Sequence, residues 1–285
     1  MAFASQNNGG GRIGIIAGSG RLPLALALTL QSNGGTPYLM LVEGEADPVD
    51  YAGFPHEIIP ITKVGRFLKA LARENCQSVT LAGPVHRPDF KNILPDVEGM
   101  KLLARLTRAS RKGDDGLMRT IAAFLQEKGF TVVGAHELAS DLLAPLGAFG
   151  KHEPGENDKA DITTGIHIVK EIGRLDIGQA AIIREGYVLA VEAAEGTDGL
   201  LKRSREFAWG HPAGVLVKLS KPQQDLRSDM PTIGRDTVQA AKEAGLKGIA
   251  VEGGKTLVLD LKEVVREADA AGLFIVGVET DGKSE

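Results

Sequence analysis

The chain has 285 residues, of which 43% are hydrophobic and 25% charged, and its formal net charge is −4. That length is enough for two ordinary domains with buried cores. Its 36 glycines follow no repeat, which excludes a collagen-like chain, and its basic residues are interleaved with acids, which argues against a nucleic-acid partner. The single cysteine, Cys76, excludes an internal disulfide and predicts a buried structural thiol in a reducing compartment. No apolar run reaches the roughly 18 residues of a membrane span, so we expect a cytoplasmic protein.

The first half of the chain alternates short β-branched runs with helical patterns. Strands are predicted at 12–16, 36–42, 78–82 and 130–133, and helices at 22–31, 64–73, 97–109, 117–128 and 137–143. Such alternation is typical of a parallel sheet that is covered on both faces. We therefore predict an α/β protein whose N-terminal domain, residues 1–143, is a Rossmann-like nucleotide-binding domain.

A change of composition marks residues 144–160, which are rich in Gly and Pro without periodicity and are predicted to be an inter-domain linker. Asp161 is predicted to cap the helix that follows. Further strands are predicted at 179–183, 187–191, 215–219, 249–251, 256–259 and 274–278, and helices at 232–244 and 262–271. The first two strands, and also 249–251 with 256–259, are interpreted as hairpins, which predicts a mixed sheet. Residues 161–285 are therefore predicted to form a C-terminal mixed α/β domain, and we expect it to be the catalytic domain.

Gly18, Ser19 and Gly20 separate the first predicted strand from the first predicted helix. Glycines let a backbone approach a ligand closely, and free N–H groups at a helix start favour phosphate. As a dinucleotide fingerprint the turn is defective, because Pro23 stands where the third glycine belongs, although Glu43 lies about 20 residues further on, where an acid meets a ribose hydroxyl. Two interpretations stay open, a phosphate or nucleotide contact and an ordinary tight turn.

Two further loops carry polar candidates. His86 and Arg87 follow a predicted strand, which is where ligands bind in open α/β sheets, and the planar fork of Arg suits phosphate. Asp114 and Asp115 are either acids at the start of a helix or part of a loop that holds a hydroxyl or a metal. A surface role for His86 stays equally open.

The densest group of charges lies in the second half. Acids follow one predicted strand, cations flank the end of the next, and further charged residues, with one threonine, lie in the segment after it. The residues are Glu192, Glu195, Asp198, Lys218, Lys221, Asp225, Arg227, Asp229 and Thr232. If the two strands are neighbours, these groups converge on one edge of the sheet. Carboxylates at this density favour Mg²⁺, a hard ion that also bridges to phosphate. The alternative is a set of helix caps and surface ion pairs.

An ordered set of segments resembles one enzyme family. The segments are RIGIIAGSGRLP, LAGPVHRP, KGDDGLMRTI, LDIGQAAI, VLAVEAAEGTDGLLKR, VLVKLSKPQQDLRSDMPTIG and AGLKGIAVEGGKTLVLD. Together they resemble the LpxI-type UDP-2,3-diacylglucosamine pyrophosphatases of lipid A biosynthesis. The resemblance implies Mg²⁺-dependent hydrolysis to UMP and 2,3-diacylglucosamine 1-phosphate, with water attacking the sugar-side phosphorus. It also implies two domains that hold the substrate between them.

The resemblance gives the charged residues their expected roles. The family's essential aspartate in the QD-x-R-x-D segment corresponds to Asp225, the expected catalytic residue. The expected metal ligands are Glu195, Asp198, Asp225 and Asp229, and the expected substrate contacts are Gly18, Ser19, Gly20, His86, Arg87, Asp114, Asp115, Thr197, Lys218, Arg227 and Thr232. We also expect a lipid-linked nucleotide-sugar substrate and transient contact with the inner face of the inner membrane, and leave a homodimer open.

Two other functions stay open on the sequence. One is an NAD(P)-dependent oxidoreductase built on the first strand, turn and helix, although Pro23 and the acid-rich second half count against it. The other is a nucleotide-binding protein without catalysis.

Overall fold

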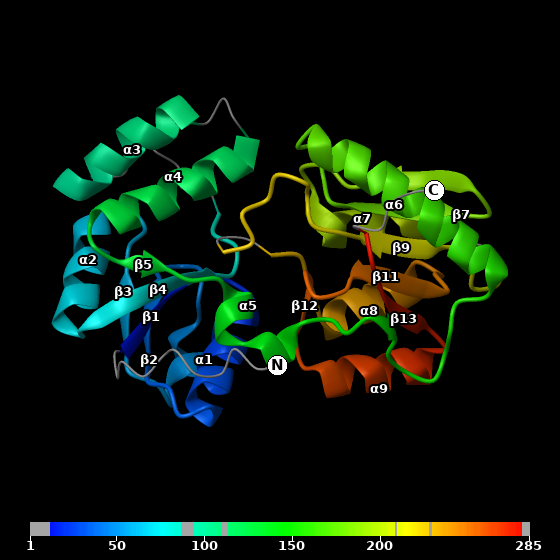
Figure 1. Ribbon diagram of the computed structural model, residues 1–285, viewed down its shortest axis with the longest axis horizontal. Coiled ribbons are helices and arrows are strands. Elements are labelled where there is room, and N and C mark those ends of the chain that lie inside the picture. Colours follow the sequence, from blue (N-terminus) through cyan, green and yellow to red (C-terminus); the bar gives the residue numbers. More distant parts are fainter. Residues whose placement is uncertain (1–11, 87–93, 110–112, 209, 228–229, 281–285) are drawn as a thin grey trace. The chain divides into compact units, whose positions relative to one another are not determined.

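The computed structural model describes residues 12–86, 94–109, 113–208, 210–227 and 230–280, and for residues 109 and 113–115 it describes the backbone alone. The chain forms two compact units (Figure 1). One consists of Met1–Ala139 with Arg227–Asp229, and the other of Ser140–Leu226 with Met230–Glu285. Each unit has a sheet and a hydrophobic core of its own.

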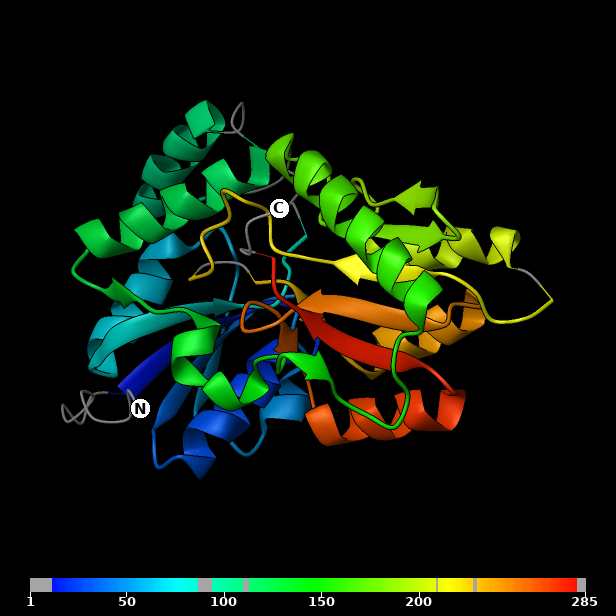
Figure 2. The same ribbon diagram turned by 45° about the vertical axis from the view of Figure 1, so that its right-hand side comes forward.

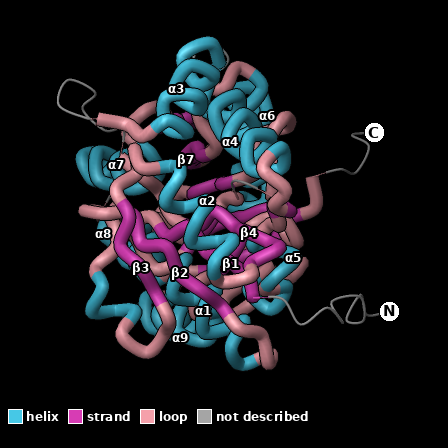
Figure 3. Tube along the Cα trace, turned by 90° about the vertical axis from the view of Figure 1, so that its left-hand side faces the viewer, coloured by secondary structure: helices cyan, strands magenta, loops and turns pink. Residues whose placement is uncertain are grey.

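The first unit is built on a parallel sheet of five strands. These are β1 (Arg12–Ala17), β2 (Pro37–Val42), β3 (His56–Ile59), β4 (Cys76–Ala82) and β5 (Thr131–Val132). They pair in the order β3-β2-β1-β4-β5, which is the order of a Rossmann fold. Figure 3 labels the first four of these strands, β1 to β4. The prediction of a Rossmann-like parallel sheet is confirmed, although β3 was not predicted.

Helices cover both faces of this sheet (Figure 1). They are α1 (Leu22–Ser32), α2 (Val64–Arg73), α3 (Val97–Ala109), α4 (Gly113–Glu127) and α5 (Ala135–Leu138), with a 3-10 turn at Pro48–Tyr51. Phe67 and Leu71 of α2 and Leu125 of α4 pack onto Met40 and Val79 of the strands. Cys76 belongs to the same core, and its burial raises the pKa of the thiol to about 11, as expected of a structural cysteine.

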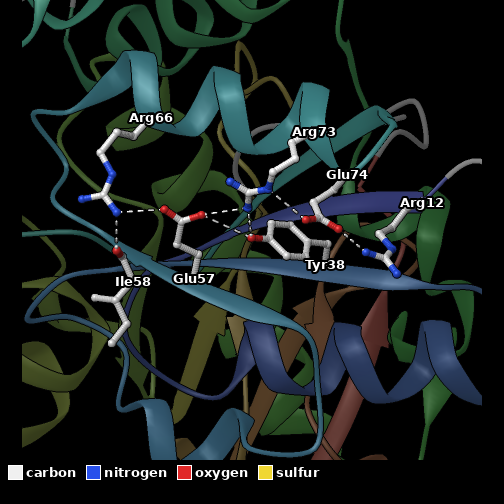
Figure 4. A network of polar contacts seen from close by, with 7 residues as sticks. All are labelled: Arg12, Tyr38, Glu57, Ile58, Arg66, Arg73 and Glu74. Carbon is white, nitrogen blue, oxygen red and sulfur yellow. Dashed lines mark hydrogen bonds and ion pairs between the residues drawn. The ribbon is translucent and has the colours of Figure 1, made fainter.

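A network of charged side chains ties α2 to the strands of the first unit (Figure 4). Arg73 of α2 donates hydrogen bonds to Glu57 of β3 and to the hydroxyl of Tyr38 of β2, both at 2.9 Å. Arg66, on the same helix, also donates to Glu57 at 2.8 Å. The hydrogen bonds from Arg66 and Arg73 hold the pKa of Glu57 below its usual value. Glu74 and Arg12 complete the network.

The second unit contains a mixed sheet of six strands. These are β6 (Gly147–Ala148), β7 (Ala180–Arg184), β8 (Tyr187–Val191), β9 (Val215–Lys218), β11 (Gly248–Glu252) and β13 (Phe274–Val278), in the order β6-β13-β11-β9-β7-β8. The central strands β9, β11 and β13 are parallel, whereas β6, β7 and β8 add antiparallel pairs. The predicted mixed-sheet α/β fold is confirmed.

Alternate residues of this sheet face different helices. The helices are α6 (Glu156–Arg174), α7 (Gly196–Ser204), α8 (Arg235–Glu243) and α9 (Leu261–Ala271). Ile182 and Ile249 belong to the core formed with α7, α8 and α9, whereas Ile183 and Ala250 belong to the core beneath α6 (Figure 2, where α6 is the long light-green helix). Because both faces are buried, these strands are continuously apolar in the sequence.

Several sequence-based boundaries are wrong in this unit. Helix α6 begins at Glu156, inside the predicted linker 144–160, which also contains β6. Asp161 therefore lies within the helix, where its buried carboxylate accepts the N–H groups of Glu185 and Gly186 in the β7–β8 turn, at 2.9 and 2.8 Å. The apolar residues of α6 did not indicate where the helix begins, because the first turn of the helix, residues 156–159, is polar.

The predicted hairpin of 249–251 with 256–259 is also wrong. The later segment forms β12 (Leu257–Val258), which pairs in parallel with β10 (Thr232–Ile233) in a separate two-stranded sheet. Thr232 consequently belongs to a strand and not to the predicted helix, which begins at Arg235. Among the described residues, no helix is long and apolar enough to cross a membrane.

Candidate functional site

In the first unit, the strand order reverses beside β1, so the loops after β1 and β4 flank the position where open α/β sheets bind ligands. The two loops are bonded to each other. The N–H of Gly18 donates to the carbonyl of Ala82, and the N–H of Ser19 donates to that of Pro84, both at 2.8 Å. The turn predicted from the sequence therefore lies at the edge of the sheet where a nucleotide would bind.

The two glycines of this turn have different reasons to be there. A Cβ added to Gly18 would lie 2.4 Å from the carbonyl oxygen of Pro84, so this glycine is required by the packing of the β4 loop. Gly20 has a φ of +83°, and a Cβ there would meet nothing within 4 Å. Arg21, at the N-cap of α1, makes no side-chain capping bond. Of the two glycines, only Gly20 borders open space next to the start of a helix, where N–H groups favour an anion.

A third loop, which follows β2, reaches the same edge through Glu45. Its Oε1 accepts the backbone N–H of His86 at 2.7 Å, and its Oε2 lies 3.0 Å from the His86 Nδ1. Burial acts to raise the pKa of Glu45, but the hydrogen bonds from His86 and Ser19 outweigh it and lower the pKa. The sequence pointed to Glu43, which is exposed, whereas Glu45 is the acid that joins the loops.

In the second unit, the two strands that lead into the acidic cluster are not neighbours. Strand β7 lies between β8 and β9 and pairs with both: Ala180 is opposite Lys218, and Ala181 is opposite Val191. Since β8 and β9 are each antiparallel to β7, they end at the same edge of the sheet. The predicted convergence on one edge therefore holds for the strand ends, but with one strand between them.

Two of the acids after β8, Glu192 and Glu195, already have partners. Glu192 is buried and accepts the hydroxyl of Thr197, in the first turn of α7, at 2.7 Å. Glu195 stands at the N-cap of α7 and forms an ion pair with Arg203 at 2.9 Å, and hydrogen bonds to its carboxylate lower its pKa. Asp198 lies in the first turn of α7, where the helix dipole favours a negative charge.

The loop after β9 carries Asp225 and is anchored at several points. Lys218 is buried, and its Nζ donates to the carbonyl of Thr232 at 2.8 Å, which brings two predicted substrate contacts together. Lys221 donates to Asp176 at 2.5 Å, and Gln223 donates to the carbonyl of Gly173 at 2.8 Å. Asp225 itself is half-buried. These contacts fix the start of the loop against the end of α6.

A buried carboxylate that was not predicted from the sequence, Glu252, ends β11 at the same edge. It accepts the N–H and the hydroxyl of Ser220, at 3.0 and 2.5 Å, and the hydroxyl of Thr280 at 2.5 Å, and it pairs with Lys255 at 3.0 Å. Burial acts to raise the pKa of Glu252, but these hydrogen bonds outweigh it and lower the pKa. The available signal was its position, because acids at the carboxyl end of a parallel strand face the ligand edge.

Family models cover almost the whole described chain. The model of the LpxI N-terminal domain matches residues 12–142, and that of the LpxI C-terminal domain matches residues 145–276. The chain belongs to the LpxI family. A curated member, "UDP-2,3-diacylglucosamine pyrophosphatase LpxI" of Caulobacter vibrioides, is 42% identical over 274 residues, which are 94% of this chain and 98% of that protein.

A solved structure, glycinamide-RNase-transformylase T from Mycobacterium tuberculosis, shows a far weaker likeness. The match covers 64% of this chain and 44% of that chain at 11% identity, with a TM-score of 0.25.

For this LpxI chain, the oxygen chemistry at the edge of the second sheet fits Mg²⁺. The Oε1 of Gln179, directly before β7, is buried and has no hydrogen-bond partner among the described residues, and Asp198 lies in the first turn of α7, which follows β8. Within that part of the chain no three His, Cys, Asp or Glu side chains form a ready-made metal cluster. Mg²⁺ commonly takes one or two carboxylates together with substrate phosphates, so such a cluster is not required.

Some predicted site residues lie outside what the structure describes. These are Arg87, Asp229, and the side chains of Asp114 and Asp115. Arg227 is counted with the first unit, where its backbone lies 3.0 Å from the position that a Cβ on Gly134 would take. The catalytic, substrate-binding and metal-binding assignments stay predictions.

Proposed function

We propose that this chain hydrolyses the diphosphate of UDP-2,3-diacylglucosamine to UMP and 2,3-diacylglucosamine 1-phosphate, a step of lipid A biosynthesis. The observation that carries the proposal is the 42% identity, over nearly the full length of both chains, to the Caulobacter protein that bears this activity in its name. The Rossmann-like sheet supports it, because the loops of its switch point are suited to a nucleotide.

In the proposed reaction, water attacks the sugar-side phosphorus and the bond from that phosphorus to the bridging oxygen breaks. UMP leaves with the bridging oxygen, and the new oxygen stays on the sugar phosphate. Asp225 orients the attacking water and accepts its proton, from a loop whose first residues are anchored to Glu252 and Asp176. The buried amine of Lys218 compensates charge on the diphosphate.

Magnesium enters the proposal through the oxygen ligands of the second unit. When bound, Mg²⁺ would neutralise charge on the diphosphate and acidify a bound water. Asp225, Asp198 and Asp229 are the carboxylates proposed to hold it. Glu195 would join them through its second oxygen, since its Oε1 holds the ion pair with Arg203.

The proposal extends to a brief contact with the cytoplasmic face of the inner membrane, because the substrate carries two acyl chains. In the first unit, Leu94 and the α3 residues Val97 and Met100 are 83%, 61% and 53% exposed. Arg105 and Arg108 follow on the same helix. An apolar strip beside cations is suited to anionic lipid. Replacing Val97 and Met100 by Ser should weaken sedimentation with anionic vesicles, and equal sedimentation would remove this strip from the proposal.

The activity is tested with the purified full chain, UDP-2,3-diacylglucosamine and Mg²⁺, by following UMP chromatographically with and without EDTA. We expect UMP in the presence of Mg²⁺ and its loss with EDTA. Asp225→Ala should lower kcat by about 10²–10⁴-fold with an unchanged circular dichroism spectrum. Asp236→Ala, an exposed aspartate in the first turn of α8, is the matched control and should retain the wild-type rate. Near-normal turnover by Asp225→Ala would remove that residue from the mechanism.

A further inference from the structure

The contact between Glu45 and His86 joins an enclosed carboxylate to an exposed imidazole. The Glu45 side chain is 10% exposed, whereas that of His86 is 87% exposed. Both oxygens of Glu45 are used, one on the backbone N–H of His86 at 2.7 Å and the other 3.0 Å from the ring Nδ1. The carboxylate thus fixes both the backbone and the ring of one residue.

The chemistry of a carboxylate determines which ring nitrogen faces outward. An ionised carboxylate only accepts hydrogen bonds, so the His86 Nδ1 that faces Glu45 carries a proton. The lowered pKa of Glu45 keeps that carboxylate ionised. The Nε2 is then the ring atom left to meet a ligand, and it donates a hydrogen bond when the ring is protonated.

The position of Glu45 and His86 in the fold indicates which kind of ligand they would meet. His86 follows β4, Glu45 follows β2, and the loop of His86 is bonded to the turn after β1 through Ser19 and Pro84. All three loops leave the carboxyl edge of the parallel sheet, next to Gly20 and the start of α1. This edge is suited to a phosphate-bearing ligand.

We propose that Glu45 is a positioning residue that acts through His86: its carboxylate accepts the Nδ1–H, so that the Nε2–H of the doubly protonated ring donates to a phosphate oxygen of the nucleotide-sugar diphosphate. The proposal rests on the proposed function for its substrate. It adds a residue with no expected role in the sequence. It also gives His86 a definite geometry: a binding contact made by one nitrogen, whose direction depends on a neighbour that does not itself touch the substrate.

The first test reads the ring directly. In ¹⁵N-labelled full-length protein in alkaline buffer, the His86 resonances, assigned by their loss in His86→Gln, should report a protonated Nδ1 and an unprotonated Nε2. Glu45→Ala should shift the ring toward the opposite tautomer, whereas Glu45→Gln, whose amide oxygen still accepts, should preserve it. A wild-type ring protonated at Nε2, or one that Glu45→Ala leaves unchanged, would overturn the proposal.

The second test uses inorganic pyrophosphate as a probe that needs no catalysis. In mildly acidic buffer, where the ring can carry both protons, adding it to the wild-type protein should shift the His86 Nε2 resonance, and Glu45→Ala should weaken the apparent affinity about tenfold, the loss expected for one misplaced hydrogen bond to a charged group. If saturating pyrophosphate does not shift the His86 Nε2 resonance, the binding role of His86 is overturned, whether or not the chain hydrolyses the lipid substrate.

The third test is a double-mutant cycle on the hydrolytic reaction. Glu45→Ala and His86→Gln should each raise KM about tenfold with a smaller change in kcat, and the double variant should resemble His86→Gln alone. Asp50→Ala, an exposed acid in the same β2–β3 connection, is the matched control and should behave as wild type. If Glu45→Ala is equally harmful in the His86→Gln background, Glu45 acts by holding the backbone and the proposal fails. If no form hydrolyses the substrate, the proposed function fails, and the two NMR tests still decide the role of Glu45.

Discussion

Glu252 accepts both the backbone N–H and the hydroxyl of Ser220, and so joins the carboxyl end of β11 to the start of the loop that carries Asp225. Its other oxygen holds Thr280, beyond the end of β13, and Lys255. One buried carboxylate thus fastens three neighbouring chain segments at a single edge of the second sheet. The proposed catalytic loop starts from this fixed point.

Glu252→Gln should destabilise the protein by about 1–3 kcal/mol, because the amide group of Gln presents N–H groups to donors that now face a carboxylate. The native pKa of Glu252 is lowered, so its contribution is present above the unfolded value of about 4.3 and is lost as the pH falls through the native value. Urea unfolding of both proteins at several pH values should therefore show the largest difference in the free energy of unfolding near neutral pH. The difference should become smaller in acid.

Glu171→Gln is the control for this measurement, because Glu171 is 52% exposed and makes only a local ion pair with Arg174. It should leave the unfolding midpoint unchanged. A gap between wild type and Glu252→Gln that stays constant into strong acid would show that the carboxylate is not the source of the stability.

The turn after β1 predicts opposite sensitivities for its two glycines. Gly18→Ala should cost about 3 kcal/mol, since its Cβ would meet backbone oxygens that cannot swing away. Gly20→Ala should cost only about 1–2 kcal/mol, the strain of a side chain at positive φ. Gly34→Ala is the control for Gly20, because Gly34 also has a positive φ and open space around it. Urea unfolding should show a larger loss of stability for Gly18→Ala than for Gly20→Ala, and Gly34→Ala should lose about as much as Gly20→Ala. Gly20→Ala should raise KM, whereas Gly34→Ala should not.

A reversed ranking, with Gly20→Ala more harmful to stability than Gly18→Ala, would contradict the role given to the loop contact. Equal KM values for Gly20→Ala and Gly34→Ala would return Gly20 to the interpretation of an ordinary turn.

The charged network of Figure 4 should contribute only modestly to stability, since solvent screens much of it. Glu57→Gln removes the acid that both Arg66 and Arg73 contact and should cost about 0.5–1 kcal/mol. About 1 M salt should reduce the loss, because it shortens the screening length. Thermal unfolding at low and high salt measures this loss. Glu156→Gln, which removes an exposed ion pair with Lys159 at the start of α6, is the control and should leave the unfolding midpoint unchanged. A salt-independent loss would assign the effect to packing.

The parallel sheet of the first unit and the mixed sheet of the second could be predicted from the sequence, because the patterns that indicate them lie in short stretches of the chain. Alternating strands and helices, with helices on both faces, required a parallel sheet in the first unit, and the hairpin at Glu185 and Gly186 required an antiparallel pair in the second. The pairing of β12 with β10 was missed, because Gly253 and Gly254 resemble a hairpin turn whereas the actual partner lies more than 20 positions away in the chain.

The candidate site was only partly predictable for the same reason. Charged residues crowded into one segment, such as Asp225 and its neighbours, are visible in the sequence. Glu45 and Glu252 act on partners 41 and 32 positions away, His86 and Ser220, and only the fold brings them together. Their one local signal is that each stands at, or shortly after, the carboxyl end of a buried strand.

We propose that water attacks the sugar-side phosphorus of UDP-2,3-diacylglucosamine in the site of this chain. Hydrolysis in ¹⁸O-labelled water, followed by mass spectrometry of both products, tests it directly. We predict one ¹⁸O atom in 2,3-diacylglucosamine 1-phosphate, none in UMP, and formation of both products about 10²–10⁴-fold more slowly by Asp225→Ala. Label in UMP would contradict the proposed direction of attack, and a reaction that yields no UMP would contradict the function itself.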